Sequence, residues 1–87
     1  MIYKDVVVSR EHRYSIGIKT DDDRRYVSIP VSNGMVDYEE YYEIDRATYD
    51  RFCADGAAAL AFAEECRQRK QDARLIQKPG KNRGTAL

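Results

Sequence analysis

The sequence predicts an α+β fold, in which a four-stranded antiparallel β-meander is followed by two C-terminal helices packed on one face of the sheet (ββββαα). Three observations support this prediction. Apolar and polar residues alternate in four segments of the first half, turn-forming residues separate those segments, and helical spacing replaces the alternation after residue 44. With 87 residues, of which 43% are apolar and 34% charged, the chain has the size and composition of one small globular domain.

The four alternating segments are the predicted strands, and they cover residues 2–9, 13–19, 24–32 and 35–44. The segments between them are rich in residues that favour turns: Arg10-Glu11-His12, Thr20-Asp21-Asp22-Asp23 and Ser32-Asn33-Gly34. Pro30 cannot donate a backbone hydrogen bond to the fourth strand. We therefore expect a four-residue loop at 32–35, which turns the backbone of this position outward.

One set of strand registers places the large apolar residues on a single face of the sheet. The predicted pairs are Val8 with Tyr14, Val6 and Val27 with Ile16, Ile29 with Tyr14 and Tyr38, and Val31 with Val36. A slip of one residue would move the whole apolar set of a strand to the opposite face, so the agreement favours the meander.

After Ile44 the spacing of apolar residues becomes helical. Asp45 is a suitable N-cap for a short helix that buries Tyr49, Phe52 and Cys53. A second helix, which begins at residue 57, is predicted to bury Ala59, Phe62, Ala63 and Cys66. We place a single domain at 1–76 and an irregular basic tail at 77–87.

Few residues suggest catalysis or metal binding. His12 is the only histidine, so a His-based triad or a Cys/His zinc cluster is hard to build. Both cysteines are expected to be buried, reduced thiols, which argues against a cysteine nucleophile. The run Asp21-Asp22-Asp23 lacks the glycine and the distant glutamate of a calcium loop. We therefore expect no enzyme, no cofactor, no metal and no small-molecule substrate.

The sequence also bears on the compartment. No apolar run approaches the roughly 20 residues that a membrane-spanning helix needs. Charged residues interrupt the first twenty positions, which argues against a signal peptide. We expect a cytoplasmic protein with no membrane partner.

The sheet face opposite the helices is predicted to carry tyrosines and carboxylates, with Tyr26 beside Tyr41. Tyrosine is enriched among interface hot spots, and residues 1–45 hold ten acids and six bases, a net charge of −4. The predicted partner-binding residues are Tyr26, Asp37, Glu39, Glu40, Tyr41 and Glu43, with Asp21, Asp22 and Asp23. Glu40 falls on the apolar face, where it either pairs with Arg25 or marks an uncovered part of the sheet. Alternatively, these charged strands serve only to keep an exposed face soluble.

The basic C-terminal end suggests a second hypothesis, a small nucleic-acid-binding regulator. Residues 66–87 contain seven bases and one acid, Asp72, and could contact phosphates. No aromatic residue follows Phe62, so base stacking is not possible in this stretch. A solvated helix face and tail is therefore the favoured interpretation, and nucleic acid is not the expected partner.

The chain from Gly34 to Gly84 resembles small bacterial immunity proteins, which are encoded beside the toxic C-terminal domains of contact-dependent growth inhibition systems. The resembling stretches are Val36-Asp37-Tyr38-Glu39-Glu40-Tyr41-Tyr42-Glu43-Ile44, Tyr49-Asp50-Arg51-Phe52, Phe62-Ala63-Glu64-Glu65-Cys66-Arg67 and Pro79-Gly80 with Arg83-Gly84. The resemblance implies a cytosolic protein that binds one toxin domain, often a nuclease, and blocks its active site or another essential surface. Because the predicted tyrosine- and acid-rich face suits a cationic surface, a basic toxin domain is the expected partner.

Overall fold

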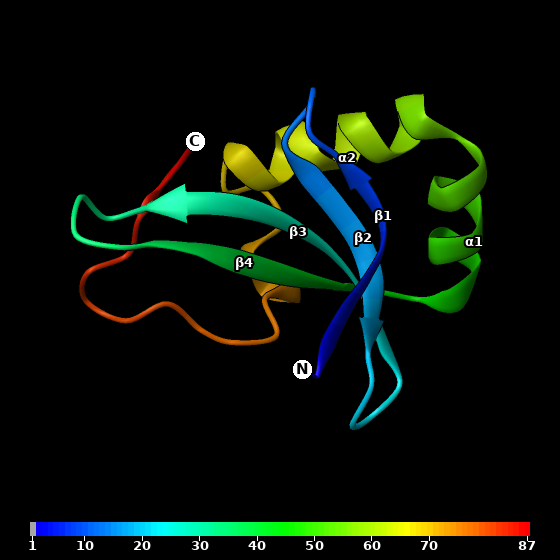
Figure 1. Ribbon diagram of the computed structural model, residues 1–87, viewed down its shortest axis with the longest axis horizontal. Coiled ribbons are helices and arrows are strands. Elements are labelled where there is room, and N and C mark those ends of the chain that lie inside the picture. Colours follow the sequence, from blue (N-terminus) through cyan, green and yellow to red (C-terminus); the bar gives the residue numbers. More distant parts are fainter. Residues whose placement is uncertain (1) are drawn as a thin grey trace.

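The computed structural model describes residues 2–87 and shows the predicted α+β fold (Figure 1). An antiparallel meander is formed in chain order by β1 (Tyr3–Ser9), β2 (Tyr14–Lys19), β3 (Arg24–Ser32) and β4 (Asp37–Ile44). It is followed by α1 (Arg46–Ala54), α2 (Gly56–Arg67), the 3₁₀-helix η1 (Asp72–Arg74) and β5 (Thr85–Ala86). Residue 1 of the predicted domain lies outside the described residues. Among residues 2–87, no helix is both long and apolar enough to cross a membrane.

The core lies between the sheet and the two helices. The sheet contributes Tyr14, Ile16, Val27, Ile29, Val31, Tyr42 and Ile44. Helix α2 contributes the four residues of its predicted stripe, all of which are buried. The predicted N-cap is also confirmed, because Asp45 Oδ1 accepts a hydrogen bond from the Thr48 N–H at 2.8 Å. Cys53, predicted to be buried, is exposed, because α1 turns Phe52 toward the core and leaves Cys53 on its solvent side (Figure 1).

The middle hairpin has the predicted register, which pairs Ile16 with Val27. The third hairpin differs by two residues, since Val31 pairs with Tyr38 and the four-residue loop covers 33–36 instead of 32–35. The turn is built on Asn33, whose Oδ1 accepts hydrogen bonds from the N–H groups of residues 35 and 36, each at 3.0 Å. Val36 therefore belongs to the exposed loop and not to the core face.

The first hairpin contains a β-bulge that the sequence did not reveal. Val7 pairs with Ile16, and the register shifts by one residue between Asp5 and Val7. As a result Val6 and Val8, predicted to face the core, are 53% and 56% exposed, and Val7 packs against the core instead. An extra residue in one strand turns the side chains on one side of the bulge to the opposite face of the sheet, and it increases the local twist.

The segment 77–87, expected to be an irregular tail, ends in a strand. Strand β5 pairs antiparallel with Val31 and Ser32 of β3. Just beyond it, the Leu87 N–H donates to the Pro30 carbonyl at 3.1 Å. The backbone of Pro30 thus points away from β4, as its lack of an N–H led us to expect.

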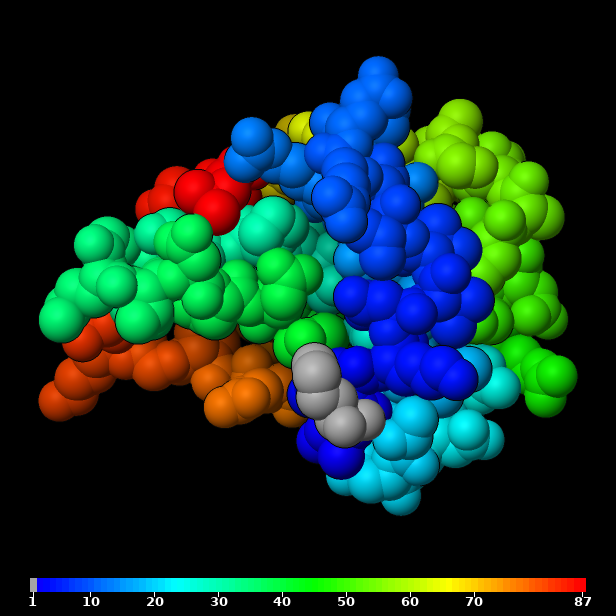
Figure 2. Space-filling view, viewed as in Figure 1, coloured from blue at the N-terminus to red at the C-terminus, as the bar shows by residue number. Residues whose placement is uncertain are grey.

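The sheet is so strongly twisted that its two end strands meet across one face. Tyr3 of β1 stacks on Tyr41 of β4, with ring centroids 3.7 Å apart. In a flat sheet three strand spacings, about 14 Å in total, would separate these strands. Figure 1 shows β1 and β2 crossing β3 and β4 steeply, and Figure 2 shows the blue residues of β1 adjoining the green hairpin of β3 and β4.

Gly17 permits this close packing. A Cβ atom on Gly17 would lie 2.2 Å from the Lys4 carbonyl oxygen and 2.4 Å from the Tyr26 hydroxyl oxygen. Neither neighbour can withdraw freely, since one is backbone and the other belongs to a fully buried ring.

We therefore expect Gly17→Ala to lower the free energy of unfolding by about 3 kcal/mol, because the inserted methyl group overpacks the tyrosine layer. Urea denaturation followed by circular dichroism would measure the loss. Gly80→Ala is the matched control, as a Cβ there has no neighbour within 4 Å among residues 2–87, and its effect should stay within about 0.5 kcal/mol. Equal stability of the two variants would contradict this view of the twisted sheet.

Candidate partner-binding surface

Tyr26, predicted to bind a partner, is completely buried and cannot contact one. Its hydroxyl donates to Asp5 Oδ1 at 2.5 Å, and its ring meets those of Tyr3 and Tyr41 edge-on, at centroid distances of 5.5 and 4.9 Å. Burial, together with this hydrogen bond, raises the pKa of the Tyr26 hydroxyl. The period-two pattern assigned Tyr26 to the correct face, but it could not show that the face folds over on itself.

Tyr41 remains available at the rim of this cluster. It is half-buried and stacks on Tyr3, with an angle of 16° between the ring planes. Burial raises the pKa of Tyr41 to about 12, and Glu39 and Asp5 act in the same direction. At neutral pH Tyr41 is thus a neutral hydroxyl on a rigid aromatic base.

Three predicted carboxylates lie on the same face of β4 as Tyr41. Asp37, Glu39 and Glu43 are all exposed and occupy alternate positions, which point to one side of a strand. Glu39 Oε1 accepts a hydrogen bond from the hydroxyl of the buried Ser28 at 3.1 Å. Although Glu39 as a whole residue is exposed, its carboxyl group is partly shielded from water. This desolvation, and then the charge of Asp5, raise the pKa of Glu39, while the hydrogen bond from Ser28 acts in the opposite direction.

Sequence reasoning missed two members of this surface. In the predicted meander β1 and β4 are the two edge strands, so Tyr3 and Asp5 were not expected near Tyr41. The twist brings them beside Tyr41 and Glu39. We call the resulting set the β4 acidic surface, and it consists of Tyr3, Asp5, Asp37, Glu39, Tyr41 and Glu43.

Glu40, also predicted to bind a partner, faces the opposite way. It is 7% exposed and pairs with Arg83, and so neither of the two expected explanations holds. Arg25 instead lies over the ring of Tyr49, at 5.4 Å from its centroid. An acid on a core face requires a cation, but the sequence does not show which cation will reach it.

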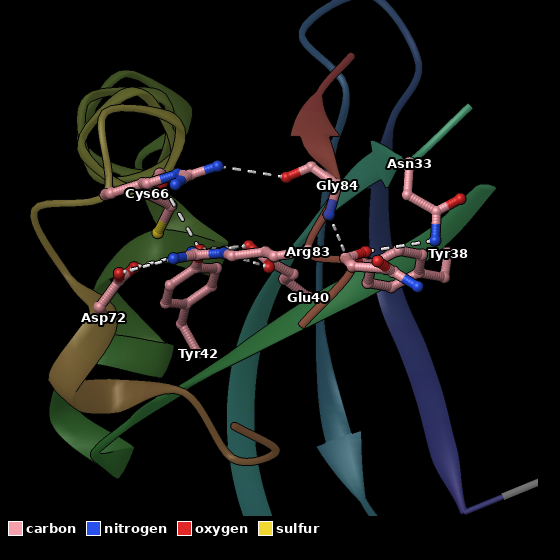
Figure 3. A network of polar contacts seen from close by, with 10 residues as sticks. Asn33, Tyr38, Glu40, Tyr42, Cys66, Asp72, Arg83 and Gly84 are labelled. Carbon is pink, nitrogen blue, oxygen red and sulfur yellow. Dashed lines mark hydrogen bonds and ion pairs between the residues drawn. The ribbon is translucent and has the colours of Figure 1, made fainter. Parts of the chain in front are cut away.

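Arg83 links Glu40 to Asp72 and thereby fixes the C-terminal segment (Figure 3). The Arg83 Nε donates to Glu40 at 2.9 Å, and two further guanidinium nitrogens donate to Asp72 at 2.8 and 2.9 Å. The Tyr42 hydroxyl adds a hydrogen bond to Glu40 at 2.8 Å. We call Arg83, Glu40, Asp72 and Tyr42 the Arg83 clasp.

The clasp is extended by the residue that follows Arg83. The Gly84 N–H donates to the Tyr38 hydroxyl at 2.7 Å, and a Cβ on Gly84 would lie 2.7 Å from the backbone of Ser32. Glycine therefore lets the end of the chain approach the sheet closely enough for β5 to pair.

The three turn aspartates, also predicted to bind a partner, are exposed but partly neutralised within the turn. Lys19 Nζ lies 2.7 Å from Asp21 and 3.2 Å from Asp22. Arg24 lies 3.1 Å from Asp22 and 3.9 Å from Glu43, so it connects the turn to one end of the β4 acidic surface. Asp23 adopts a left-handed conformation with φ 64°. The turn therefore adds less negative charge than its sequence suggests.

No group of three or more His, Cys, Asp or Glu side chains among residues 2–87 could hold a metal ion. Burial raises the pKa of the Cys66 thiol to about 12, so little of the nucleophilic thiolate forms at neutral pH. Comparison of the chain with protein-family models, with curated proteins and with solved structures finds no match.

The clasp can be tested by Arg83→Ala, which would leave the buried Glu40 carboxylate without a counter-charge. We expect the free energy of unfolding to fall by about 3 kcal/mol in urea denaturation at pH 7. The double variant Glu40→Gln with Arg83→Met removes both charges and should recover part of this loss. A loss below about 1 kcal/mol for Arg83→Ala would contradict the clasp.

The cost of Arg83→Ala should also depend on pH. Hydrogen bonds from Arg83 lower the pKa of Asp72 in the folded protein. The resulting stabilisation is present above the ordinary carboxyl pKa of about 3.9 and is lost as the pH falls through the lowered value. The stability difference between the natural protein and Arg83→Ala should therefore shrink below pH 4.

Proposed function

We propose that this protein is a non-enzymatic immunity protein, which binds a basic toxin domain through the β4 acidic surface and thereby neutralises it. The observation that carries the proposal is the arrangement of carboxylates on β4. Among residues 2–87, Asp5, Asp37 and Glu39 have no ion-pair partner, and Glu43 has only the distant Arg24. Unpaired carboxylates beside a rigid, half-buried tyrosine suit a cationic protein surface.

The physical roles of the two residue types differ. Complementary charge speeds the encounter between two proteins, and buried aromatic contacts slow their separation. The β4 acidic surface offers both, with carboxylates along the strand and Tyr41 stacked in their midst. The resemblance to immunity proteins supports the same function, and a nuclease is a suitable toxin because surfaces that bind phosphates are basic.

The alternative, a nucleic-acid-binding regulator, has less support. Four of the seven C-terminal bases are engaged within the protein, and one of them, Arg69, donates to the Gly84 carbonyl at 3.4 Å. Arg83 belongs to the clasp, Arg67 donates to the carbonyls of His12 and Arg13, and Arg74 Nε donates to Gln71 at 2.9 Å. Fewer bases are left to contact phosphates than the sequence suggested.

The proposal can be tested with Asp37→Lys and the toxin domain encoded beside this protein's gene. Asp37 is exposed and has no side-chain partner among residues 2–87, so the fold should be unaffected. We expect the association rate at low salt to fall about tenfold, because a charge is reversed within the attracting surface. Stopped-flow fluorescence or surface plasmon resonance would measure the rate.

Asp50→Lys on α1 is the matched control, because it makes the same charge change at another exposed position. It should leave the association rate within about twofold of the natural protein. Equal effects of the two variants would mean that only the net charge matters. The β4 acidic surface would then not be the binding site. If the toxin domain does not bind the natural protein at all, the proposed function is refuted.

A further inference from the structure

The outer edge of β4 carries backbone groups that residues 2–87 leave unpaired. In an antiparallel ladder, alternate residues direct both backbone groups to the same side. The Ile76 N–H donates to the Tyr41 carbonyl at 2.9 Å, so the odd-numbered residues of β4 point away from β3. Pro30 leads to the same conclusion. Its carbonyl accepts a hydrogen bond from Leu87, on the side of β3 that faces away from β4, and its partner in the β3–β4 ladder is Glu39. Glu39 therefore presents its N–H and its carbonyl outward.

The chain covers this edge only in part. Leu75 and Ile76 pair with β4 at Tyr41 and Tyr42 and then leave it. Within residues 2–87, no hydrogen bond reaches the outward backbone groups of Asp37 or Glu39. Pairing within the chain thus ends at Tyr41, and the edge of β4 at Asp37 and Glu39 stays uncovered.

A cleft of about 370 Å³ lies against this uncovered edge. One wall is formed by Tyr38, Glu39, Glu40 and Tyr41, and the other by the segment 77–82, with Asn33 at the end. Figures 1 and 2 show that this segment, in orange, runs beside the green hairpin. The cleft therefore has the outline of a slot along a strand edge.

Contacts at both ends hold the slot open. At one end Ile76 is bonded to Tyr41, and at the other the Asn33 side-chain N–H donates to the Asn82 carbonyl at 3.2 Å. The Arg83 clasp fixes the chain just beyond. Pro79 in the middle has no N–H to pair with β4.

The charges around the slot differ from wall to wall. Glu39, with Asp37 beside it, makes one side acidic, and the charge of Glu40 is balanced by Arg83. Lys78 and Lys81 are exposed on the opposite wall and have no ion-pair partner within residues 2–87. Side chains alternate between the two faces of a sheet, so every second side chain of an added strand would lie on the face of Asp37 and Glu39, where a basic side chain fits best.

We propose that the edge of β4 at Asp37–Glu39 accepts an extended segment of the toxin domain as an added strand, with basic side chains at alternate positions. The proposal rests on the proposed function and specifies how the partner is held. Backbone hydrogen bonds to an exposed edge supply affinity, and the flanking side chains supply specificity. The partner strand would pair with β4 next to the point where Ile76 leaves it.

The test compares Glu39→Pro with Glu39→Gln. Both variants remove the carboxylate, but only proline removes the outward N–H and places ring carbons at the edge. Proline is tolerated at an edge position whose N–H lies outside the ladder. By isothermal titration calorimetry with the toxin domain, we expect Glu39→Pro to bind at least tenfold more weakly than Glu39→Gln.

Amide hydrogen exchange measured by NMR gives a second readout, which does not require the proline variant to fold. The Glu39 amide should exchange at least tenfold more slowly in the complex, and the Asp50 amide on α1 should not change. Binding with equal affinity for both variants, or with unprotected Glu39, would overturn the proposal but leave the proposed function intact. If the free protein dimerises in sedimentation with Glu39 protected, the occupant is a second copy and the proposal fails. Absence of any binding to the natural protein overturns both proposals.

Discussion

The ion pair between Glu40 and Arg83 is the constraint on which much of the structure depends. Glu40 is buried on the core face of β4, and a buried carboxylate is costly unless a cation and further hydrogen bonds satisfy it. Arg83 supplies the cation from 43 residues further along the chain. To do so it must bring the whole C-terminal segment back to the sheet. The pairing of β5 with β3 and the slot beside β4 both follow from this return.

The same strand therefore has two different faces. Its even-numbered residues Tyr38, Glu40 and Tyr42 are used for folding, since they contact the core, the clasp or the C-terminal segment. Its odd-numbered residues carry the carboxylates and Tyr41, and they remain at the surface. A change to an odd-numbered residue can thus alter binding with little effect on the fold, whereas a change to Glu40 affects the fold first.

Much of the fold could be predicted from the sequence, because alternation and turn residues are local signals. The four strands, the N-cap Asp45 and the buried stripe of α2 all belong to this class. The features that were missed depend on contacts between distant residues. The bulge near Val6, the stacking of Tyr3 on Tyr41 and the pairing of Arg83 with Glu40 have no signature within a short window. The alternation located most of the candidate site on the correct face, but it could not show that Tyr26 lies beneath its neighbours.

The most direct test of the account maps the toxin domain onto the protein. Labelled protein would be titrated with the toxin domain, and amide chemical shifts would be followed by NMR. We expect the largest changes at Asp37, Glu39, Tyr41 and Glu43, with Asp5 beside them. Changes confined to the exposed faces of α1 and α2, or to the bases near Arg69 and Lys70, would contradict the assignment of the β4 acidic surface.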